Sequence, residues 1–260
     1  MSLFFFRALM IGGVLSLTAC ASAPSEQQAA TANNTQPAYV DVRDPLERIN
    51  RPLWDFNYDV LDAYLLRPLT VGYITVVPKP ARKGLSNVVN NLGEPASFVN
   101  SVLQAKPKKA AVSVGRFVLN STTGFFGLFD VATNIGLTNA EEDFSQTMAV
   151  WGIGDGPFLM IPARGPTTVR DTAGSLVDNL YFPLSLLNTP LTISRAVIGA
   201  LDGREQLMQV ENMLNDSLDP YSFVKESYYQ RQIFKIYDGN PPQPEETLDD
   251  DMLDFLEEIE

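Results

Sequence analysis

The chemistry open to this chain is limited by two residue types. Its 260 residues include one cysteine, Cys20, and no histidine. A Ser-His-Asp site, a Cys-His site and a histidine-ligated zinc site are therefore excluded. An enzyme built from this sequence would have to use carboxylates, lysine, tyrosine or hydroxyl groups. We accordingly predict no catalytic residue, no metal site and no cofactor.

The single cysteine stands at the end of an apolar N-terminal segment. Residues 8–19 are apolar or small and follow one cation, Arg7. About 20 consecutive apolar residues are needed to span a bilayer, so residues 1–19 are predicted to be a cleaved secretory signal. Residues 17–20, LTAC, are similar to the lipobox of bacterial lipoproteins, in which the cysteine sulfur receives a diacylglycerol. The alternative is a plain cleaved signal with an incidental cysteine.

A lipidated Cys20 predicts attachment to a membrane by a short tether. One acyl chain binds a membrane only marginally, whereas two signals hold firmly, and the lipoprotein modification adds several chains. By the same resemblance Ala21, where Asp would favour the inner membrane, indicates the outer membrane of a Gram-negative bacterium. Residues 20–40 are rich in Ala, Ser, Gln, Asn and Thr, which predicts disorder. Such a tether reaches roughly 25 Å on average and about 70 Å at most.

The acidic charge of the chain is concentrated at its C-terminus. The formal net charge is −12, but residues 245–260 hold nine of the 31 acidic residues and no basic residue. Residues 21–244 hold 22 acidic and 18 basic residues, a net charge of −4. A basic face for nucleic acid is absent from this distribution. We therefore exclude a nucleic-acid partner.

Three groups of residues could do chemistry but have simpler interpretations. Gly152, Gly154 and Gly156 do not have the spacing of a dinucleotide fingerprint and are predicted to be turn glycines. The acidic residues 141–143 lack the spaced oxygens of a calcium loop, so a solvated helix start is favoured. Glu94 could be a lone general acid for glycoside cleavage. Its place before a proline favours a helix start instead, where a carboxylate is stabilised by the positive end of the dipole.

Residues 41–239 are predicted to form one helical domain. Asp44, Pro45 and Glu47 have the types and spacing of a helix start with a side-chain cap, and a second Asp-Pro pair stands at residues 219 and 220. Apolar residues at three- and four-residue steps predict amphipathic helices, within residues 54–65, 85–103, 169–180 and 193–208. Residues 71–78 have strand-like composition and could equally continue a helix.

Two apolar segments are interrupted by glycine and proline. They are residues 120–137 and residues 151–166, and both are unusually apolar for loops. Exposed apolar patches mark membrane or partner contacts, although burial in a core is the simpler alternative for any one side chain. The candidates for lipid-channel or membrane contact are Phe125, Phe126, Phe129, Trp151, Gly152, Gly154, Gly156 and Phe158.

The acidic tail, residues 240–260, is also amphipathic. Leu248, Met252, Phe255 and Ile259 fall on one helical face. A purely solvating tail would not need such a face, so these four residues are candidates for docking into a partner's groove. The open alternative is a helix that packs on its own domain.

Four motifs resemble the MlaA (VacJ) family of outer-membrane lipoproteins. They are DPLERINRPLWDFNYDVLDAYLLRPL, VPKPARKGLSNVVNNLGEPASFVNSVLQ, RFVLNSTTGFFGLFDVA and WGIGDGPFLMIP. The resemblance covers about residues 40–238. It implies an all-α fold, a single ring-shaped bundle of amphipathic helices with a central polar channel, lying beside a trimeric porin. It also implies that GIGDGPFLMIP is a mobile hairpin near the channel and that the phenylalanine-rich segment is wall embedded in the membrane.

The function implied by the resemblance is phospholipid transport without catalysis. Phospholipids misplaced in the outer leaflet would be removed and passed to a soluble periplasmic carrier, which maintains lipid asymmetry. A lipid-anchored cell-wall lytic enzyme that uses Glu94 is one alternative, and a structural lipoprotein that associates with porins is another.

Overall fold

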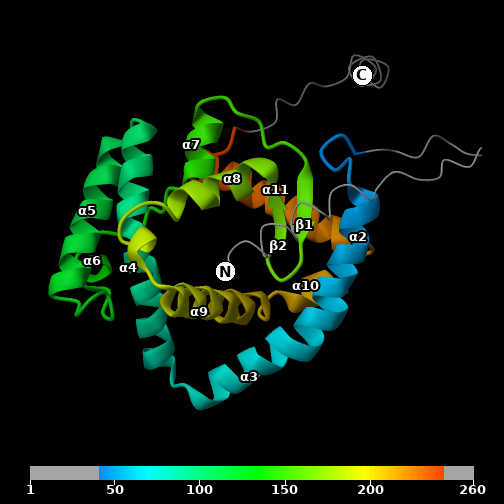
Figure 1. The fold of residues 1–260 in the computed structure, drawn as a ribbon, viewed down its shortest axis with the longest axis horizontal. Helices are drawn as coiled ribbons and strands as arrows, with labels where there is room; N and C mark the ends of the chain where they lie inside the picture. The colour runs from blue at the N-terminus through cyan, green and yellow to red at the C-terminus, as the bar shows by residue number, and fades with distance from the viewer. Residues whose placement is uncertain (1–40, 243–260) are drawn as a thin grey trace, which may run out of the picture. The chain divides into compact units, whose positions relative to one another are not determined.

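The computed structural model describes residues 41–242 (Figure 1). The predicted signal, the tether and nearly all of the acidic tail lie outside this range. Among the described residues the expected all-α class is confirmed, with one two-stranded sheet. The elements in chain order are α2 (Glu47–Asp55), the π-helix η2 (Phe56–Leu66), α3 (Arg67–Val76), α4 (Lys79–Leu103), α5 (Pro107–Thr122), α6 (Val131–Asn134), α7 (Phe144–Val150), β1 (Phe158–Ile161), β2 (Gly165–Thr168), α8 (Val169–Asp178), the 3-10 helix η3 (Leu184–Leu186), α9 (Thr189–Leu207), α10 (Glu211–Asn215) and α11 (Pro220–Ile236).

Helix α2 begins later than its sequence predicts. Leu46, not Asp44, precedes the first helical residue, Glu47, and the start has no side-chain cap. The buried Asp44 carboxylate instead accepts hydrogen bonds from Asn50 Nδ2 at 2.8 Å and from the Tyr221 hydroxyl. The predicted cap at Asp44 is therefore wrong, because a tertiary contact uses the side chain that the local pattern assigned to the helix end.

The two other local expectations were closer to the structure. Asp219 precedes the first residue of α11, and Pro220 occupies that first position, where its missing N–H is not needed. Residues 71–76 continue α3 and do not form a strand. Their β-branched composition left both alternatives open, and the contacts of α3 with α9 and η2 favour the helix.

The sheet is a hairpin within residues 158–168, directly after the glycines at positions 152, 154 and 156. Strands β1 and β2 pair antiparallel, with Phe158 opposite Thr168 and Ile161 opposite Gly165. The turn between them includes Ala163, which has a positive φ of 62°. One edge of β1 is paired with β2, so the other edge requires hydrogen-bond partners from elsewhere.

Two asparagines supply those partners from the first helical segment. Asn50 Nδ2 donates to the Phe158 carbonyl oxygen at 3.0 Å, and its Oδ1 accepts from the Met160 N–H at 3.0 Å. Asn57 does the same for the carbonyl of Ile161 and the N–H two residues later, at 3.0 and 2.8 Å. Each side-chain amide thus occupies the place of one residue of a neighbouring strand. Together they fix the hairpin against α2 and η2.

A small aromatic core lies between this hairpin and α11. Phe158, Met160, Tyr221 and Tyr229 are buried together. The Phe158 ring contacts the rings of Tyr221 and Tyr229 with centroids 6.2 and 6.0 Å apart, within the range of favourable aromatic pairs. The core therefore joins the hairpin to the last helix of the domain.

Contacts between neighbouring elements form a closed circuit within the described domain. Helix α2 contacts β1, β1 pairs with β2, and β2 contacts α8. Helix α8 packs on α7, α7 on α4, and the chain itself returns from α4 through α3 and η2 to α2. Helix α9 lies against α3, α4 and η2, and runs between α4 and α10 in Figure 1.

No single helix in residues 41–242 is both long and apolar enough to cross a membrane. The stretch Glu47–Val76 and helix Lys79–Leu103, bent by 120° with respect to each other, satisfy the requirement of length and composition as a pair.

The Asn50 contact predicts a measurable loss of stability on truncation. Asn50→Ala leaves the Phe158 carbonyl and the Met160 N–H without their partners, and each unpaired buried group costs about 1–3 kcal/mol. We expect the free energy of unfolding in detergent to fall by about 2–6 kcal/mol. The matched control is Asn212→Ala, which changes an exposed residue on α10 and should stay within about 0.5 kcal/mol of wild type. Equal stability of the two variants would contradict the role of Asn50.

Candidate lipid interface and polar interior

The described domain reverses the usual distribution of polar and apolar side chains. Apart from four glycines, its buried residues comprise 22 polar or charged residues and eight apolar or aromatic ones. In contrast, 38 large apolar or aromatic residues are exposed. Proteins that meet only water rarely expose contiguous apolar patches of more than a few hundred square ångströms. The outer surface is therefore the first candidate for a functional site.

The exposed apolar residues lie on the outer sides of several helices. Their number alone would be unremarkable on a protein with a large apolar core, but α3, α4, α5, α8 and α9 each bury polar residues as well. The exposed set includes Leu65 and Leu69 on η2 and α3, Val102 on α4, Val114 and Val118 on α5, Leu176 on α8, and Leu191, Ile193, Val197 and Leu207 on α9.

A buried ion pair organises the polar interior between α4 and α5. Glu94 on α4 is 2% exposed and accepts a short hydrogen bond from Arg116 Nε on α5. Arg116 also donates to Thr133 Oγ1 at 2.9 Å and to the Leu137 carbonyl at 2.6 Å. Burial raises the pKa of Glu94 while Arg116 acts to lower it. The carboxylate that the sequence offered as a general acid is thus engaged in an interhelical ion pair.

Ion pairs also attach α9 to its neighbours. Arg204 forms a bidentate ion pair with Asp62 on η2, with hydrogen bonds of 2.6 and 2.8 Å. It also donates a hydrogen bond to Glu211 on α10 at 2.9 Å. Arg82 on α4 pairs with Glu205 at 2.6 Å. Because these charged contacts hold the inner side of α9, its apolar side chains can face outward.

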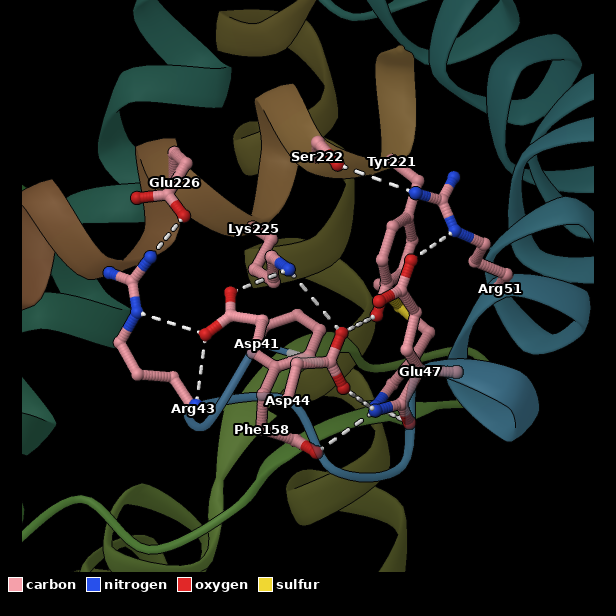
Figure 2. A network of polar contacts seen from close by, with 12 residues as sticks. Asp41, Arg43, Asp44, Glu47, Arg51, Phe158, Tyr221, Ser222, Lys225 and Glu226 are labelled. Carbon is pink, nitrogen blue, oxygen red and sulfur yellow. Dashed lines mark hydrogen bonds and ion pairs between the residues drawn. The ribbon is translucent and has the colours of Figure 1, made fainter. Parts of the chain in front are cut away.

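A polar network joins the start of the domain to α11 (Figure 2). Lys225 Nζ donates to Asp41 at 2.9 Å and lies 3.6 Å from Asp44. The Tyr221 hydroxyl donates to Asp44. Burial acts to raise the pKa of Asp41, but the bond from Lys225 brings it below its usual range. For Tyr221, burial and the Asp44 carboxylate together raise the pKa.

The same network extends along α2 through Arg51. Arg51 donates to both carboxylate oxygens of Asp219 at 3.0 and 2.7 Å, and its guanidinium lies 4.6 Å from the centre of the Tyr221 ring. The hydrogen bonds from Arg51 hold the pKa of Asp219 well below its usual range. This planar two-bonded geometry is specific to arginine, so it fixes the direction of α2 relative to α11.

Phe125, Phe126 and Phe129 project from a strained turn. All three are more than 60% exposed. Phe125 and Phe126 have φ values of 53° and 57°, a left-handed conformation that is costly for bulky residues. Gly127 has a φ of 92°, and a Cβ there would approach Asn91 to 2.6 Å. The backbone is therefore held in a strained form that presents aromatic rings outward, which is typical of a functional turn.

The glycine-containing segment is a turn that leads into β1. Gly152 and Gly156 have positive φ values of 84° and 68°, as expected of turn glycines. Trp151 is 52% exposed, and its ring meets that of Phe144 edge-on at 5.9 Å. A Cβ on Gly154 would meet open space. Trp151 therefore stays a candidate for membrane contact.

Phe158 requires a correction. The sequence grouped it with the lipid-contact candidates, but its side chain is 0% exposed and belongs to the aromatic core. Alternation along β1 points this ring inward, because successive strand residues face opposite sides. The interpretation of Phe158 as a membrane-contact residue is therefore wrong.

Other predicted residues lie outside the described range, and other functional contacts were missed. Cys20 and the tail candidates Leu248, Met252, Phe255 and Ile259 fall within residues 1–40 and 243–260. Asn50 and Asn57 were not predicted to be hairpin contacts. Their seven-residue spacing on one helical face was visible, but the partners are more than 100 residues away in the chain.

A helical domain that buries ion pairs and exposes apolar side chains belongs to the class of proteins that contact lipid or a partner over a large surface. The family model described as MlaA lipoprotein matches residues 42–235. The chain belongs to this family.

Similar proteins extend over nearly the whole chain. The intermembrane phospholipid transport system lipoproteins MlaA of Shigella flexneri and Escherichia coli strain K12 are each 38% identical over 95% of this chain and 96% of their own. The Haemophilus influenzae protein of the same name is 34% identical over 92% of this chain and 93% of its own. A solved structure described as the structural basis for maintenance of bacterial outer membrane lipid asymmetry has a TM-score of 0.71 and 41% identity, and covers 74% of this chain and 98% of its own.

Asp178 predicts a pH dependence of stability. Burial raises the pKa of Asp178 from 3.8 to about 6, against hydrogen bonds from the Phe144 N–H and Asn100. The folded state therefore holds this proton more strongly than the unfolded state does. As pH rises from about 4 to 6, ionisation of Asp178 should lower the free energy of unfolding by an amount on the order of 3 kcal/mol.

The variant Asp178→Asn tests this prediction. Asp178 Oδ1 accepts from Asn100 Nδ2 at 2.7 Å and from the Phe144 N–H at 3.2 Å, and Oδ2 accepts from the same N–H at 3.0 Å. An amide oxygen at the Oδ1 position can keep the first two bonds and loses only the third, so the variant should be less stable than the wild type at low pH. Unfolding measured in detergent from pH 4 to 7 should lose the fall seen in the wild type. Asp216→Asn, at an exposed position, is the matched control and should keep the wild-type profile. A wild-type profile in Asp178→Asn would contradict the assignment.

Proposed function

We propose that this protein is a lipid-anchored outer-membrane component of a phospholipid transport system. It removes misplaced phospholipids from the outer leaflet and passes them to a soluble periplasmic carrier, which maintains lipid asymmetry. The observation that carries the proposal is the reversed polarity of the domain, with ion pairs inside and large apolar side chains outside. The names of the similar transport lipoproteins support the same function.

The free-energy cost of moving a phospholipid explains why such a surface is needed. A phospholipid has about 30 tail methylenes, and at about 0.8 kcal/mol each their transfer into water costs on the order of 25 kcal/mol. A protein that moves the lipid without an energy source at this step must keep the tails in an apolar environment. Apolar helix faces outside and polar groups inside give tails and headgroup separate environments, so the domain needs no catalytic group.

The anchor and the partners complete the proposal. Acylation of Cys20 would hold the domain at the outer membrane, at a distance no greater than the tether of residues 20–40 can span. A trimeric porin is the proposed neighbour in the membrane, and the exposed helix faces offer apolar surface for it. The soluble carrier is the proposed acceptor of the lipid. The amphipathic tail is the proposed docking segment for that carrier.

The strained turn that carries Phe125 and Phe126 predicts a specific loss of membrane binding. In the chain that starts at residue 21 and lacks the anchor, Phe125→Asn with Phe126→Asn removes two rings worth about 1.5–3 kcal/mol each in an apolar medium. Asparagine tolerates positive φ, so the turn should keep its form. We expect sedimentation with phospholipid vesicles to weaken by about 100-fold or more. The control, Phe125→Leu with Phe126→Leu, keeps apolar side chains and should bind much better. Equal binding of both double variants would argue against insertion of the turn.

The tail predicts a separable contact. Deletion of residues 245–260 removes the candidates Leu248, Met252, Phe255 and Ile259 together with nine acidic residues. Transfer of lipid to the soluble carrier should fall, while the fraction of protein in the outer membrane stays at the wild-type level. A scrambled tail of equal charge, in which the apolar residues no longer share a face, is the control for net charge. Loss of membrane association on deletion would contradict this division of roles.

Lipid analysis and one activity assay discriminate the proposal from the enzymatic alternative. The full-length protein purified in mild detergent should carry phospholipid, identified by mass spectrometry, and should not cleave peptidoglycan. The proposal is overturned if the protein carries no phospholipid and peptidoglycan cleavage is present in the wild type and lost in Glu94→Gln.

A further inference from the structure

The C-terminal end of α11 exposes an apolar surface. Ile233, Phe234 and Tyr237 are 45%, 57% and 49% exposed. Their three- and four-residue spacing places them on one side of the last turns of the helix. A Cβ on Gly239 would lie 3.2 Å from Cζ of Phe234, so this ring reaches over the turn at which the chain leaves the helix. The apolar surface therefore extends to the start of the acidic tail.

An ion-pair cluster fixes this end of α11 to the start of α5. Asp238 accepts hydrogen bonds from Lys106 Nζ at 2.7 Å and from Lys109 Nζ at 2.6 Å. The same two ammonium groups donate to Glu142, whose side chain is fully buried. Because Asp238 directly follows Tyr237 in the chain, the lysines at the start of α5 lie next to the apolar surface.

Two further cations border these apolar side chains. Lys108 stands between the two lysines of the cluster, and Arg231 precedes Phe234 by three residues, which places the two side by side on the helix. Both cations are exposed, and neither forms an ion pair with the residues that the structure describes. Unpaired charges are costly to bury in hydrocarbon, so lipid tails fit this surface poorly. The α11-end surface comprises Lys108, Arg231, Ile233, Phe234 and Tyr237.

The composition of the acidic tail is complementary to this surface. Residues 245–260 hold nine acidic residues and no basic residue. Their sequence also predicts one helical face that carries Leu248, Met252, Phe255 and Ile259. A segment with apolar residues on one face and acidic residues beside it can cover the apolar side chains of α11 and pair with the cations. Opposite charges on the two partners would also fix the register of the contact.

The connection between the tail and this surface is short. The tail begins one residue after Gly239, and Leu248 is nine residues after that glycine, which corresponds to about 30 Å at most. A short linker gives a segment an effective concentration in the millimolar range near the domain that carries it. A separate partner at lower concentration has to displace it. The tail of the same chain is therefore the favoured occupant.

We propose that the acidic tail docks on the α11-end surface of its own domain, with its apolar face on Phe234 and Tyr237 and its acidic residues beside Lys108 and Arg231. The docked tail is withheld from the soluble carrier, which has to displace it before it receives lipid. This consequence rests on the proposed transport function, in which the tail binds that carrier, whereas the docking itself does not.

Binding of the tail as a separate peptide tests the proposal. A fluorescent peptide of residues 245–260 is titrated with the lipidated protein in detergent, either full-length or lacking those residues, and its anisotropy is measured. The tail-deleted protein should bind at least about tenfold more tightly, because the tail of the full-length protein occupies the surface. In the tail-deleted protein, Phe234→Ser with Tyr237→Ser should weaken binding by about tenfold or more. The matched control, Met213→Ser with Leu218→Ser, changes exposed apolar residues near the other end of α11 and should bind like its parent.

An exchange of charges separates loss of docking from loss of the fold. In the tail-deleted protein, Lys108→Glu with Arg231→Glu should weaken binding of the natural peptide. A peptide with Asp249→Lys, Asp250→Lys and Asp251→Lys should bind this variant more tightly than it binds the parent, which a misfolded variant would not do. The proposal is overturned if full-length and tail-deleted protein bind the natural peptide equally, or if a peptide of the same composition in scrambled order binds as tightly. It is also overturned if the double serine variant at the end of α11 binds like its control.

Failure of this inference can be distinguished from failure of the proposed function. If the wild-type protein carries phospholipid but the peptide fails these tests, the docking of the tail is wrong and transport stands. If the protein carries no phospholipid, and cells that lack it keep an outer leaflet free of phospholipid, the transport function itself is wrong, whether or not the tail docks.

Discussion

Segregation of apolar and charged groups is the constraint on which this structure depends. Because most large apolar side chains are exposed, few remain to form a conventional core. The helices are joined instead by paired charges such as Glu94–Arg116 and Asp62–Arg204. Buried pairs of this kind add little net stability as pairs, but removal of one partner costs about 3–5 kcal/mol. The interior can therefore hold polar groups, but the fold is destabilised when one partner of a buried pair is removed. A domain built in this way can stay folded with lipid on its outside.

The same segregation explains how one domain can treat the two ends of a phospholipid differently. The tails require an apolar environment at all times, and η2, α5 and α9 expose apolar side chains that could offer it. The headgroup requires a polar environment, and α4 and α5 bury polar side chains such as Asn91, Glu94 and Arg116. The hairpin is held to α2 and η2 by Asn50 and Asn57, so its position follows that of the first helical segment. Strained backbone at Phe125 and Phe126 places aromatic rings where they meet the surroundings.

Local patterns predicted much of the fold and part of the site. Helical periodicity, the Asp219-Pro220 start and the turn glycines at 152 and 156 depend on neighbours in sequence, and the structure confirms them. The roles of Asp44, Asn50 and Phe158 depend on residues more than 100 positions away, which periodicity does not encode. An apolar side chain has the same signal whether it faces a core or lipid, and so Phe158 and Phe126 could not be separated before the fold was known.

The central claim is that acyl tails, and not water, surround the outer helix faces. Its most direct test is the collision accessibility of nitroxide labels on the lipidated, membrane-bound protein, attached through cysteines introduced at Leu69, Val118 and Ile193. These three residues are exposed and apolar in the structure. If acyl tails surround these faces, apolar oxygen reaches the labels readily and a water-soluble nickel complex does not. Easy access of the nickel complex at all three positions would contradict it.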